Sequence, residues 1–299
     1  MNTFKYFTAK TVKEACELLS QYGEEAKILG GGQSLVNLMK QNLVNPSYII
    51  DIKGLSDLDY IRYDKKDGLR IGAVSTHRMV ETSEAVKENF TMLAEMERTL
   101  ASVAVRNWGT VGGSLAHADP ASDLAATLMA LGARVTLTRS QGERVVSLDD
   151  FFVDYFETAL RSDEMLTEIH IPNSGRGNGF YYKFAQRETD LAVVSVAVYL
   201  ILGPDDPDLC QDIRIVMGSV GSTPLRSRRG EDLLKGQAIT GRLIEEAARM
   251  SAEDAQPTTD INGSEQYKRD LVHVLVSRSI KKALSRASTT QAPKNGTPA

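Results

Sequence analysis

The sequence predicts an α+β fold of two domains followed by a short mobile tail. The chain has 299 residues, a length typical of two domains of ordinary size. A strand, a glycine run, a helix and a second strand come first, and strands joined by tight turns follow them. Residues 172–179, rich in Gly, Asn and Ser, indicate a linker. We therefore expect domains over 1–175 and 176–287, and a tail over 288–299, which lacks apolar periodicity.

Composition excludes several classes of protein. The net charge of −4 and the pI of about 5.7 give no electrostatic footprint for nucleic acid. Arg226, Arg228 and Arg229 cluster, and we expect them in a solvated or partner-facing loop. Cys16 and Cys210 are too few for a disulfide framework, an iron–sulfur cluster or a zinc site, and the four histidines have no metal-binding spacing. With no signal pattern and no membrane span in the sequence, we expect a cytoplasmic protein with no metal site of its own.

The first elements follow from local signals. Thr11 and Glu14 form a capping box, in which the Thr hydroxyl accepts from a first-turn N–H and the Glu side chain reaches back. The helix that they begin ends at Gly23. We expect a strand at 26–29, the glycine run at 30–32, a helix at about 35–40 and a strand at 47–52.

Turn signals and periodicity divide the rest of the chain. In the first domain we expect two short strands around Asp67-Gly68, a helix at 91–104, a glycine-rich stretch at 106–123, a helix from Asp123 to Gly132, and paired strands around Gln141-Gly142. In the second domain we expect strands at 180–185, 192–202 and 212–218, and helices at about 240–254 and 265–286.

Two glycine segments carry the chemistry, Leu29–Leu35 (LGGGQSL) and Thr110–Ala116 (TVGGSLA), the second continuing to Asp123. Consecutive glycines let backbone N–H groups converge and let a bulky anion approach without meeting Cβ atoms. Two such segments predict that both phosphates of a dinucleotide are bound from opposite sides, with backbone N–H donors from each segment. Ser34, Thr110 and Ser114 add hydroxyl groups, and Asp123 is placed to accept from a ribose or another cofactor hydroxyl.

Other functions match the sequence less well. A Rossmann-type NAD-binding unit expects an acidic residue about twenty positions after the glycines, and Asp51 stands there. However, Leu35 occupies the place of the third glycine, and the βαβ pattern does not continue. A P-loop fails because no Gly-Lys-Ser/Thr follows either run, and the G-x-S-x-G elbow of hydrolases is absent. A non-enzymatic dinucleotide-binding scaffold subunit stays open.

Both segments resemble those of a known family. GGGQSL at 30–35 and TVGGSLAHADPASD at 110–123 resemble the loops of the FAD-binding medium subunits of the xanthine dehydrogenase and carbon monoxide dehydrogenase family of molybdenum hydroxylases. The likeness extends to VRN at 105–107, KFAQR at 183–187, DLA at 190–192 and GSTPLR at 221–226.

This resemblance implies a two-part FAD-binding domain of the PCMH/vanillyl-alcohol-oxidase type, followed by a small domain with a three-stranded antiparallel sheet and helices. No side chain is then expected to do covalent chemistry, since the flavin performs the redox step. Lys183 would lie near the isoalloxazine ring, or else be an exposed strand-end lysine, and Leu100 or Ala101 would face the ring. His117 either touches the cofactor or acts as a spacer. The cofactor would be held by Lys27, Ile28, Leu29, Gly30, Gly31, Gly32, Gln33, Ser34, Leu35, Ala101, Gly109, Thr110, Val111, Gly112, Gly113, Ser114, Ala116, His117, Asp123, Leu166 and Lys183.

The resemblance also implies partners. A large subunit would carry molybdopterin and the substrate site, a small subunit would carry two [2Fe–2S] clusters, and the whole would be a dimer of heterotrimers. Electrons would pass from molybdenum through the clusters to this flavin and then to an external acceptor. Some relatives bind an extra cluster on a cysteine-bearing loop, which a chain with only two cysteines should lack.

Overall fold

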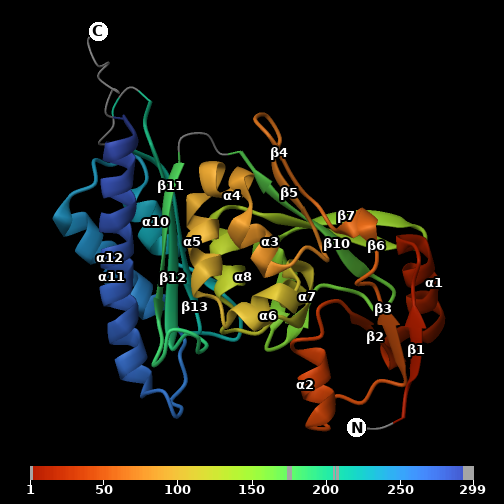
Figure 1. Cartoon of the computed structure of the whole chain (residues 1–299). Coiled ribbons are helices and arrows are strands. Elements are labelled where there is room, and N and C mark those ends of the chain that lie inside the picture. Colours follow the sequence, from red (N-terminus) through yellow and green to blue (C-terminus); the bar gives the residue numbers. More distant parts are fainter. Residues whose placement is uncertain (1–2, 174–176, 205, 207–208, 292–299) are drawn as a thin grey trace.

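The described residues form three main sheets and one two-stranded sheet, and a layer of helices lies between the second and the third of the main sheets (Figure 1). In the computed structural model, the described residues are 3–173, 177–204, 206 and 209–291. Figure 1 shows the small N-terminal sheet at one end, the central helices in the middle and the long C-terminal helix at the opposite end. Among the described residues, no helix is long and apolar enough to cross a bilayer.

The N-terminal lobe is a parallel sheet of order β1-β3-β2 with helices beside it. Its elements are β1 (Lys5–Thr8), α1 (Val12–Tyr22), η1 (Gly23–Glu25), β2 (Ala26–Leu29), α2 (Leu35–Lys40), β3 (Tyr48–Asp51) and η2 (Ser56–Leu58). The capping box is confirmed, because the Thr11 side chain accepts from the Glu14 N–H and the Glu14 carboxylate accepts from the Lys10 N–H. The sequence did not predict β1, a short strand whose side chains are mostly exposed.

The central part is an antiparallel sheet of order β4-β5-β10-β6-β7 covered by short helices. Its strands are β4 (Ile61–Asp64), β5 (Gly68–Gly72), β6 (Arg134–Arg139), β7 (Gly142–Ser147) and β10 (Met165–Pro172), and β8 (Phe152–Asp154) and β9 (Glu157–Thr158) form a separate hairpin. Its helices are α3 (His77–Thr82), α4 (Glu84–Asn89), α5 (Thr91–Thr99), α6 (Val103–Trp108), α7 (Val111–His117), α8 (Asp123–Ala130) and α9 (Leu148–Phe151).

Two expectations for this part were wrong. The helix predicted at 91–104 is interrupted, because Ala101 has a left-handed backbone (φ 43°) that separates α5 from α6. The glycine-rich stretch at 106–123, which we expected to be a loop before the helix at 123, is largely helical. Thr110 caps α7 by accepting from the Gly113 N–H, so Gly112 and Gly113 belong to the first turn of that helix.

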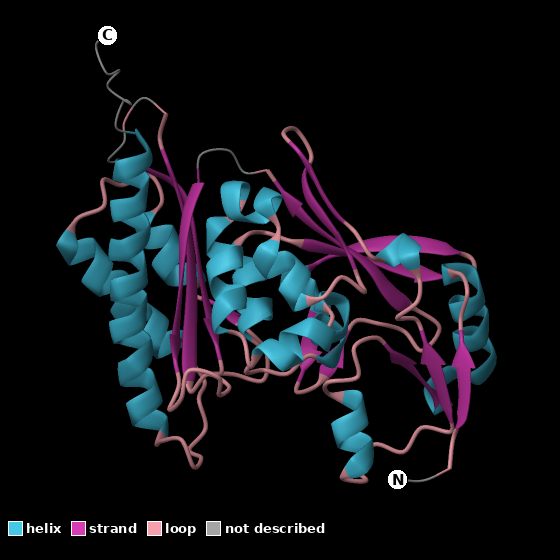
Figure 2. Cartoon of the chain, viewed as in Figure 1, coloured by secondary structure: helices cyan, strands magenta, loops and turns pink. Residues whose placement is uncertain are grey.

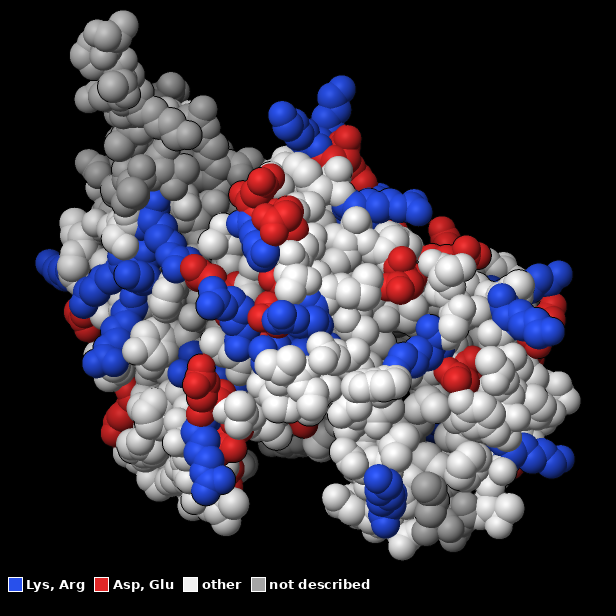
Figure 3. All heavy atoms as spheres, viewed as in Figure 1, with Lys and Arg blue, Asp and Glu red and all other residues white. Residues whose placement is uncertain are grey.

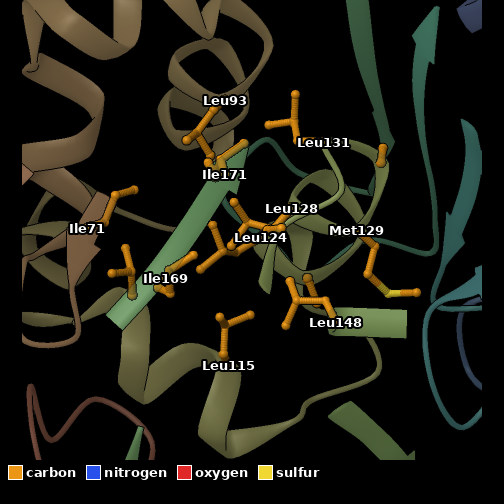
Figure 4. Close-up of a cluster of buried hydrophobic side chains, with 14 of the residues drawn as sticks. Ile71, Leu93, Leu115, Leu124, Leu128, Met129, Leu131, Leu148, Ile169 and Ile171 are labelled. Atoms are coloured by element: carbon orange, nitrogen blue, oxygen red, sulfur yellow. The ribbon is translucent and has the colours of Figure 1, made fainter. Parts of the chain in front are cut away.

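The central core lies between the sheet and the helices. Figure 4 shows Ile169 and Ile171 of β10 pointing toward Leu124 and Leu128 of α8, and all four side chains are buried. The same core also includes Ala197, which belongs to the C-terminal sheet. The core of the central part is therefore completed by residues of the C-terminal sheet.

The C-terminal part is an antiparallel sheet of order β11-β12-β13-β14. Its elements are β11 (Gly177–Phe184), β12 (Val194–Leu202), β13 (Cys210–Gly218), β14 (Leu225–Arg226), α10 (Arg228–Leu234), α11 (Gly241–Asp254) and α12 (Glu265–Gln291). The three long strands are as expected, and the two-residue β14 and the helix α10 were not predicted. The helix expected to end at 286 continues to Gln291, so the tail predicted over 288–299 was wrong for residues 288–291, which are helical. The rest of the tail, 292–299, lies outside the described residues, as do residues 174–176 of the linker.

Helices cover both faces of this sheet. Figure 2 shows the C-terminal helices on one side and the central helices on the other. On the outer side, α11 and α12 pack on a second core that includes Val194, Val196 and Val198. The near-continuous burial of β12 follows from this position between two helical layers.

Ion pairs join the two parts at their junction. Arg286 of α12 binds Glu95 of α5 with Nη1 2.8 Å from Oε2. Arg226 binds Glu231 and Asp149, with Nη1 2.8 Å from the Asp149 Oδ2. We had expected the three clustered arginines to lie in a loop, and this was wrong. Arg226 lies in β14, Arg228 and Arg229 begin α10, and all three are paired with carboxylates.

Candidate functional site

A large cavity opens where the N-terminal lobe meets the central part. It has a volume of about 1190 Å³, above the roughly 300–1,000 Å³ of pockets for drug-sized ligands. Figure 3 shows the surface indented between the N-terminal lobe and the central body. The C-terminal part also contributes to the lining, through Lys183 and residues 189–191. A cavity of this volume can hold a ligand larger than a typical drug-sized molecule, such as a dinucleotide.

The structure brings nearly all predicted site residues to this cavity. Twenty of the twenty-one line it, from Lys27–Leu35 through Ala101, Gly109, the α7 segment and Asp123 to Leu166 and Lys183. Val111 does not: its side chain is buried in the central core. Asp51, the acidic residue of the Rossmann alternative, does not line the cavity either, and its carboxylate accepts hydrogen bonds from the Tyr6 hydroxyl and the Lys53 N–H.

The two glycine segments touch each other. A Cβ atom on Gly31 would lie 1.9 Å from the carbonyl oxygen of Trp108 and 2.8 Å from the Cα of Gly109. A Cβ atom on Gly30 would lie 2.8 Å from the Thr110 Oγ1. Side chains at these positions would push the segments apart, so close backbone approach is one reason for glycine here. The two segments are near enough to share one ligand.

The glycines do not all serve the purpose that the sequence suggested. We expected each to leave room for a phosphate, yet a Cβ atom on Gly112 would lie 2.6 Å from the Cβ and 2.7 Å from the oxygen of Ala73. Gly112 is therefore required by packing of α7 on the strand end before α3. Gly32 is required by its backbone, since its φ of +72° is a left-handed value.

The backbone donors are also distributed unevenly. Within the described residues, the N–H groups of residues 31–34 have no protein acceptor, so they are available to an anion. The α7 segment differs: the N–H groups of Val111, Gly112, Gly113 and Ser114 bind Ser75 O, Ala73 O, Thr110 Oγ1 and Thr110 O. The expectation of free N–H donors from both segments was therefore wrong for the second, because its glycines are helical.

Lys183 and Asp123, which line the cavity, belong to a buried polar cluster. Lys183 of β11 places its Nζ 2.7 Å from Asp123 Oδ2 and 3.1 Å from the carbonyl oxygen of Thr99, and the Tyr181 hydroxyl donates to Asp123 Oδ1. Burial raises the pKa of the Asp123 carboxyl, and the Lys183 ammonium opposes that rise. An ammonium has three donors, and the two bonds here leave one for a ligand. Lys183 is buried at the cavity wall, which excludes the exposed strand-end alternative.

The backbone at Leu100 and Ala101 is held by a buried arginine. The Nη1 of Arg106 donates to the carbonyl oxygens of both residues, at 2.8 and 2.9 Å, and its Nε is 2.9 Å from Glu81 Oε2. These contacts stabilise the left-handed turn at Ala101, which lines the cavity beside Leu100.

At the cavity rim, His117 stacks at a tilt on Phe156, with ring centroids 5.2 Å apart. Burial lowers the pKa of its imidazole, which favours the neutral ring.

Sequence reasoning missed several polar residues that line the cavity, among them Arg161, Glu164 and His77. His77 lines the cavity although it lies more than thirty positions before the second segment. Its Nδ1 lies 3.0 Å from Glu97 Oε2, and both side chains are buried. Only the fold brings His77, Glu97 and Gly109 together, so local sequence carried no signal for it.

The described residues contain no group of three or more His, Cys, Asp or Glu side chains placed to hold a metal ion. Cys16 and Cys210 are buried in separate cores.

Two protein families together match nearly the whole chain, and both agree with the resemblance seen in the sequence. Residues 2–174 match the FAD binding domain in molybdopterin dehydrogenase, and residues 180–283 match the CO dehydrogenase flavoprotein C-terminal domain. The chain is 34% identical over 290 residues to the 6-hydroxypseudooxynicotine dehydrogenase complex subunit alpha of Paenarthrobacter nicotinovorans, covering 97% of each protein.

Two solved structures are similar in fold and sequence. Carbon monoxide dehydrogenase from Hydrogenophaga pseudoflava, in a form lacking the Mo-pyranopterin moiety of its molybdenum cofactor, matches with a TM-score of 0.92 and 32% identity, over 95% of this chain and 98% of that one. Quinoline 2-oxidoreductase from Pseudomonas putida 86 matches with a TM-score of 0.89 and 31% identity, over 96% and 98%. The chain thus belongs to the FAD-binding medium subunits of the molybdenum hydroxylase family, which are oxidoreductases.

Proposed function

We propose that this chain holds FAD in the cavity between its lobes and relays electrons within a molybdenum-dependent hydroxylase or dehydrogenase. It would receive electrons from the [2Fe–2S] clusters of a small subunit and pass them to an external acceptor. The single observation that carries the proposal is the contact between the two glycine segments at a cavity of about 1190 Å³.

The residues of the cavity suit the parts of FAD. The free N–H groups of residues 31–34 would bind the diphosphate, and the Ser34 hydroxyl, which makes no cap bond in α2, would add a donor. Leu166 and the Leu100–Ala101 turn would contact the flavin ring. Asp123 has both carboxylate oxygens engaged by protein, so any cofactor hydroxyl would bind to a remaining lone pair.

Bound FAD supplies reversible redox chemistry, and the protein orients the ring and sets its electrostatic surroundings. Lys183 would place a buried positive charge at the cavity wall, where it would favour negative charge on the flavin ring. The Thr99 carbonyl and the Asp123 carboxylate hold this ammonium in position.

We further propose that the molybdopterin lies on a large subunit, the clusters on a small one, and that the complex is a dimer of heterotrimers. The names of the relatives support a multi-subunit enzyme, because these proteins are named as a subunit or a medium chain of a dehydrogenase. The two cysteines of this chain lie in separate cores and cannot share a cluster. A cytoplasmic location stays a prediction.

The oxidised substrate would be read by the large subunit rather than by this chain. Relatives of nearly equal similarity carry names that refer to different substrates, among them carbon monoxide, nicotine and quinoline.

Purification of the full-length chain tests the proposal. A chain that binds FAD is yellow, because the oxidised flavin absorbs at about 450 nm. A colourless chain that takes up no added FAD would favour the non-enzymatic scaffold instead. Co-purification from the native source, followed by molybdenum, iron and flavin analysis, tests the two partner subunits.

A further inference from the structure

His77 and Glu97 form a buried pair beside the second glycine segment. The Nδ1 of His77 lies 3.1 and 3.0 Å from the two carboxylate oxygens of Glu97, and the residues are 3% and 0% exposed. A carboxylate accepts hydrogen bonds, so Nδ1 is the donor to Glu97 and Nε2 is the ring nitrogen left for a ligand. Among the described residues, none is bonded to this Nε2, and His77 lines the cavity.

The imidazole lies where the two glycine segments meet. The backbone N–H of His77 donates to the carbonyl oxygen of Gly109 at 3.0 Å. A Cβ atom on Gly109 would lie 3.1 Å from His77 Cδ2 and 3.6 Å from Gln33 Cγ. The ring edge that carries Cδ2 and Nε2 therefore lies next to Gly109, which has no side chain to cover it.

A donor is needed at this place. The first segment offers N–H groups to an anion, but the N–H groups of residues 111–114 are bonded within the protein. A diphosphate between the segments would thus lack backbone donors from these residues on the α7 side. The fully buried Glu97 carboxylate in turn needs a cation or a donor, because an unpaired buried charge is costly. An imidazolium between Glu97 and a phosphate satisfies both groups.

We propose that His77, with both ring nitrogens protonated, donates a hydrogen bond from Nε2 to the diphosphate of the cofactor, and that Glu97, which accepts from Nδ1, is the positioning residue that holds the ring in this orientation. This inference rests on the proposed function, in which FAD occupies the cavity.

The test uses the full-length chain freed of flavin and titrated with FAD, with flavin fluorescence as the readout of affinity. We expect His77→Asn to weaken FAD binding about tenfold or more, as for loss of a hydrogen bond to a charged group. Glu97→Gln keeps an acceptor for Nδ1 without the negative charge, and we expect a smaller loss. The matched control is His170→Asn: His170 binds the Asp67 carbonyl oxygen away from the cavity, and its variant should bind FAD within about twofold of wild type.

Phosphorus NMR of bound FAD separates direct contact from a structural role. We expect the phosphorus resonances of bound FAD to shift in His77→Asn and to stay unchanged in His170→Asn. Affinity of His77→Asn within about twofold of wild type, or weaker binding with unshifted resonances, overturns the inference. If His77→Asn does not fold because Glu97 loses its partner, the His77→Asn, Glu97→Gln double variant is judged by the same criteria. Failure of the wild-type chain to bind FAD would instead refute the proposed function.

Discussion

The contact between the glycine segments predicts that Gly31→Ala disrupts the site. The new Cβ atom would meet the Trp108 oxygen at 1.9 Å, the Trp108 carbonyl carbon at 2.7 Å and the Gly109 Cα at 2.8 Å. All three neighbours are backbone atoms, so no rotamer change relieves the overlap. Overpacking costs about 1–3 kcal/mol, and we expect the upper end, about 3 kcal/mol of unfolding free energy. Since the segments must separate, FAD affinity should fall by about tenfold or more, the loss of one or two donors.

The assay is urea unfolding of the flavin-free chain followed by far-UV circular dichroism, together with FAD titration. Fluorescence of Trp108, the only tryptophan, reports on the same contact. Gly54→Ala is the control, because a Cβ atom there meets nothing within 4 Å. That variant should differ from wild type by no more than about 0.5 kcal/mol. Equal unfolding free energies and equal FAD affinities for the two variants would refute the reasoning.

Three further perturbations test other parts of the structure. Lys183→Met leaves the Asp123 carboxylate buried with Tyr181 as its remaining side-chain partner, and urea unfolding should show a loss of about 3–5 kcal/mol of unfolding free energy. Adding Asp123→Asn should recover much of that loss, because no unpaired charge is then buried. A double variant as unstable as Lys183→Met would contradict the ion-pair argument. Hydrogen bonds from Arg144 lower the pKa of Glu164, so this pair stabilises the fold above the ordinary carboxyl pKa and the contribution is lost as pH falls through the lowered value. Arg144→Met should therefore lose less stability than wild type between about pH 5 and pH 3, and equal acid sensitivity would argue against it. Burial raises the pKa of Cys16 to about 11 and of Cys210 to about 12, so neither thiol should react with a disulfide reagent at neutral pH until urea unfolds the chain.

Local signals predicted the elements that depend on local physics. The Thr11 capping box and the strand before Gly30 could be predicted from the sequence because each depends on a few adjacent residues. By contrast, α7 was hidden, since two glycines in its first turn oppose helix formation and only the Thr110 cap and packing on Ala73 support it.

The sequence identified most of the residues of the two glycine segments that line the cavity, but not the role of each glycine. Whether a missing Cβ makes room for a ligand or for another part of the protein depends on contacts made far along the chain. Gly112 faces Ala73, and Gly31 faces Trp108. His77 was missed for the same reason, because its orientation is set by Glu97, twenty positions later.

The core shared across the junction has a thermodynamic consequence. Ala197 and Val216 of the C-terminal sheet are buried in the same cluster as Leu124 and Leu128 of α8, so separating the parts would expose apolar surface on both. Such an arrangement favours a single calorimetric transition over two. A ligand that contacts both Gly31 and Lys183 would then raise the melting temperature of the whole chain. Only a chain in which both parts are correctly folded would retain the cofactor.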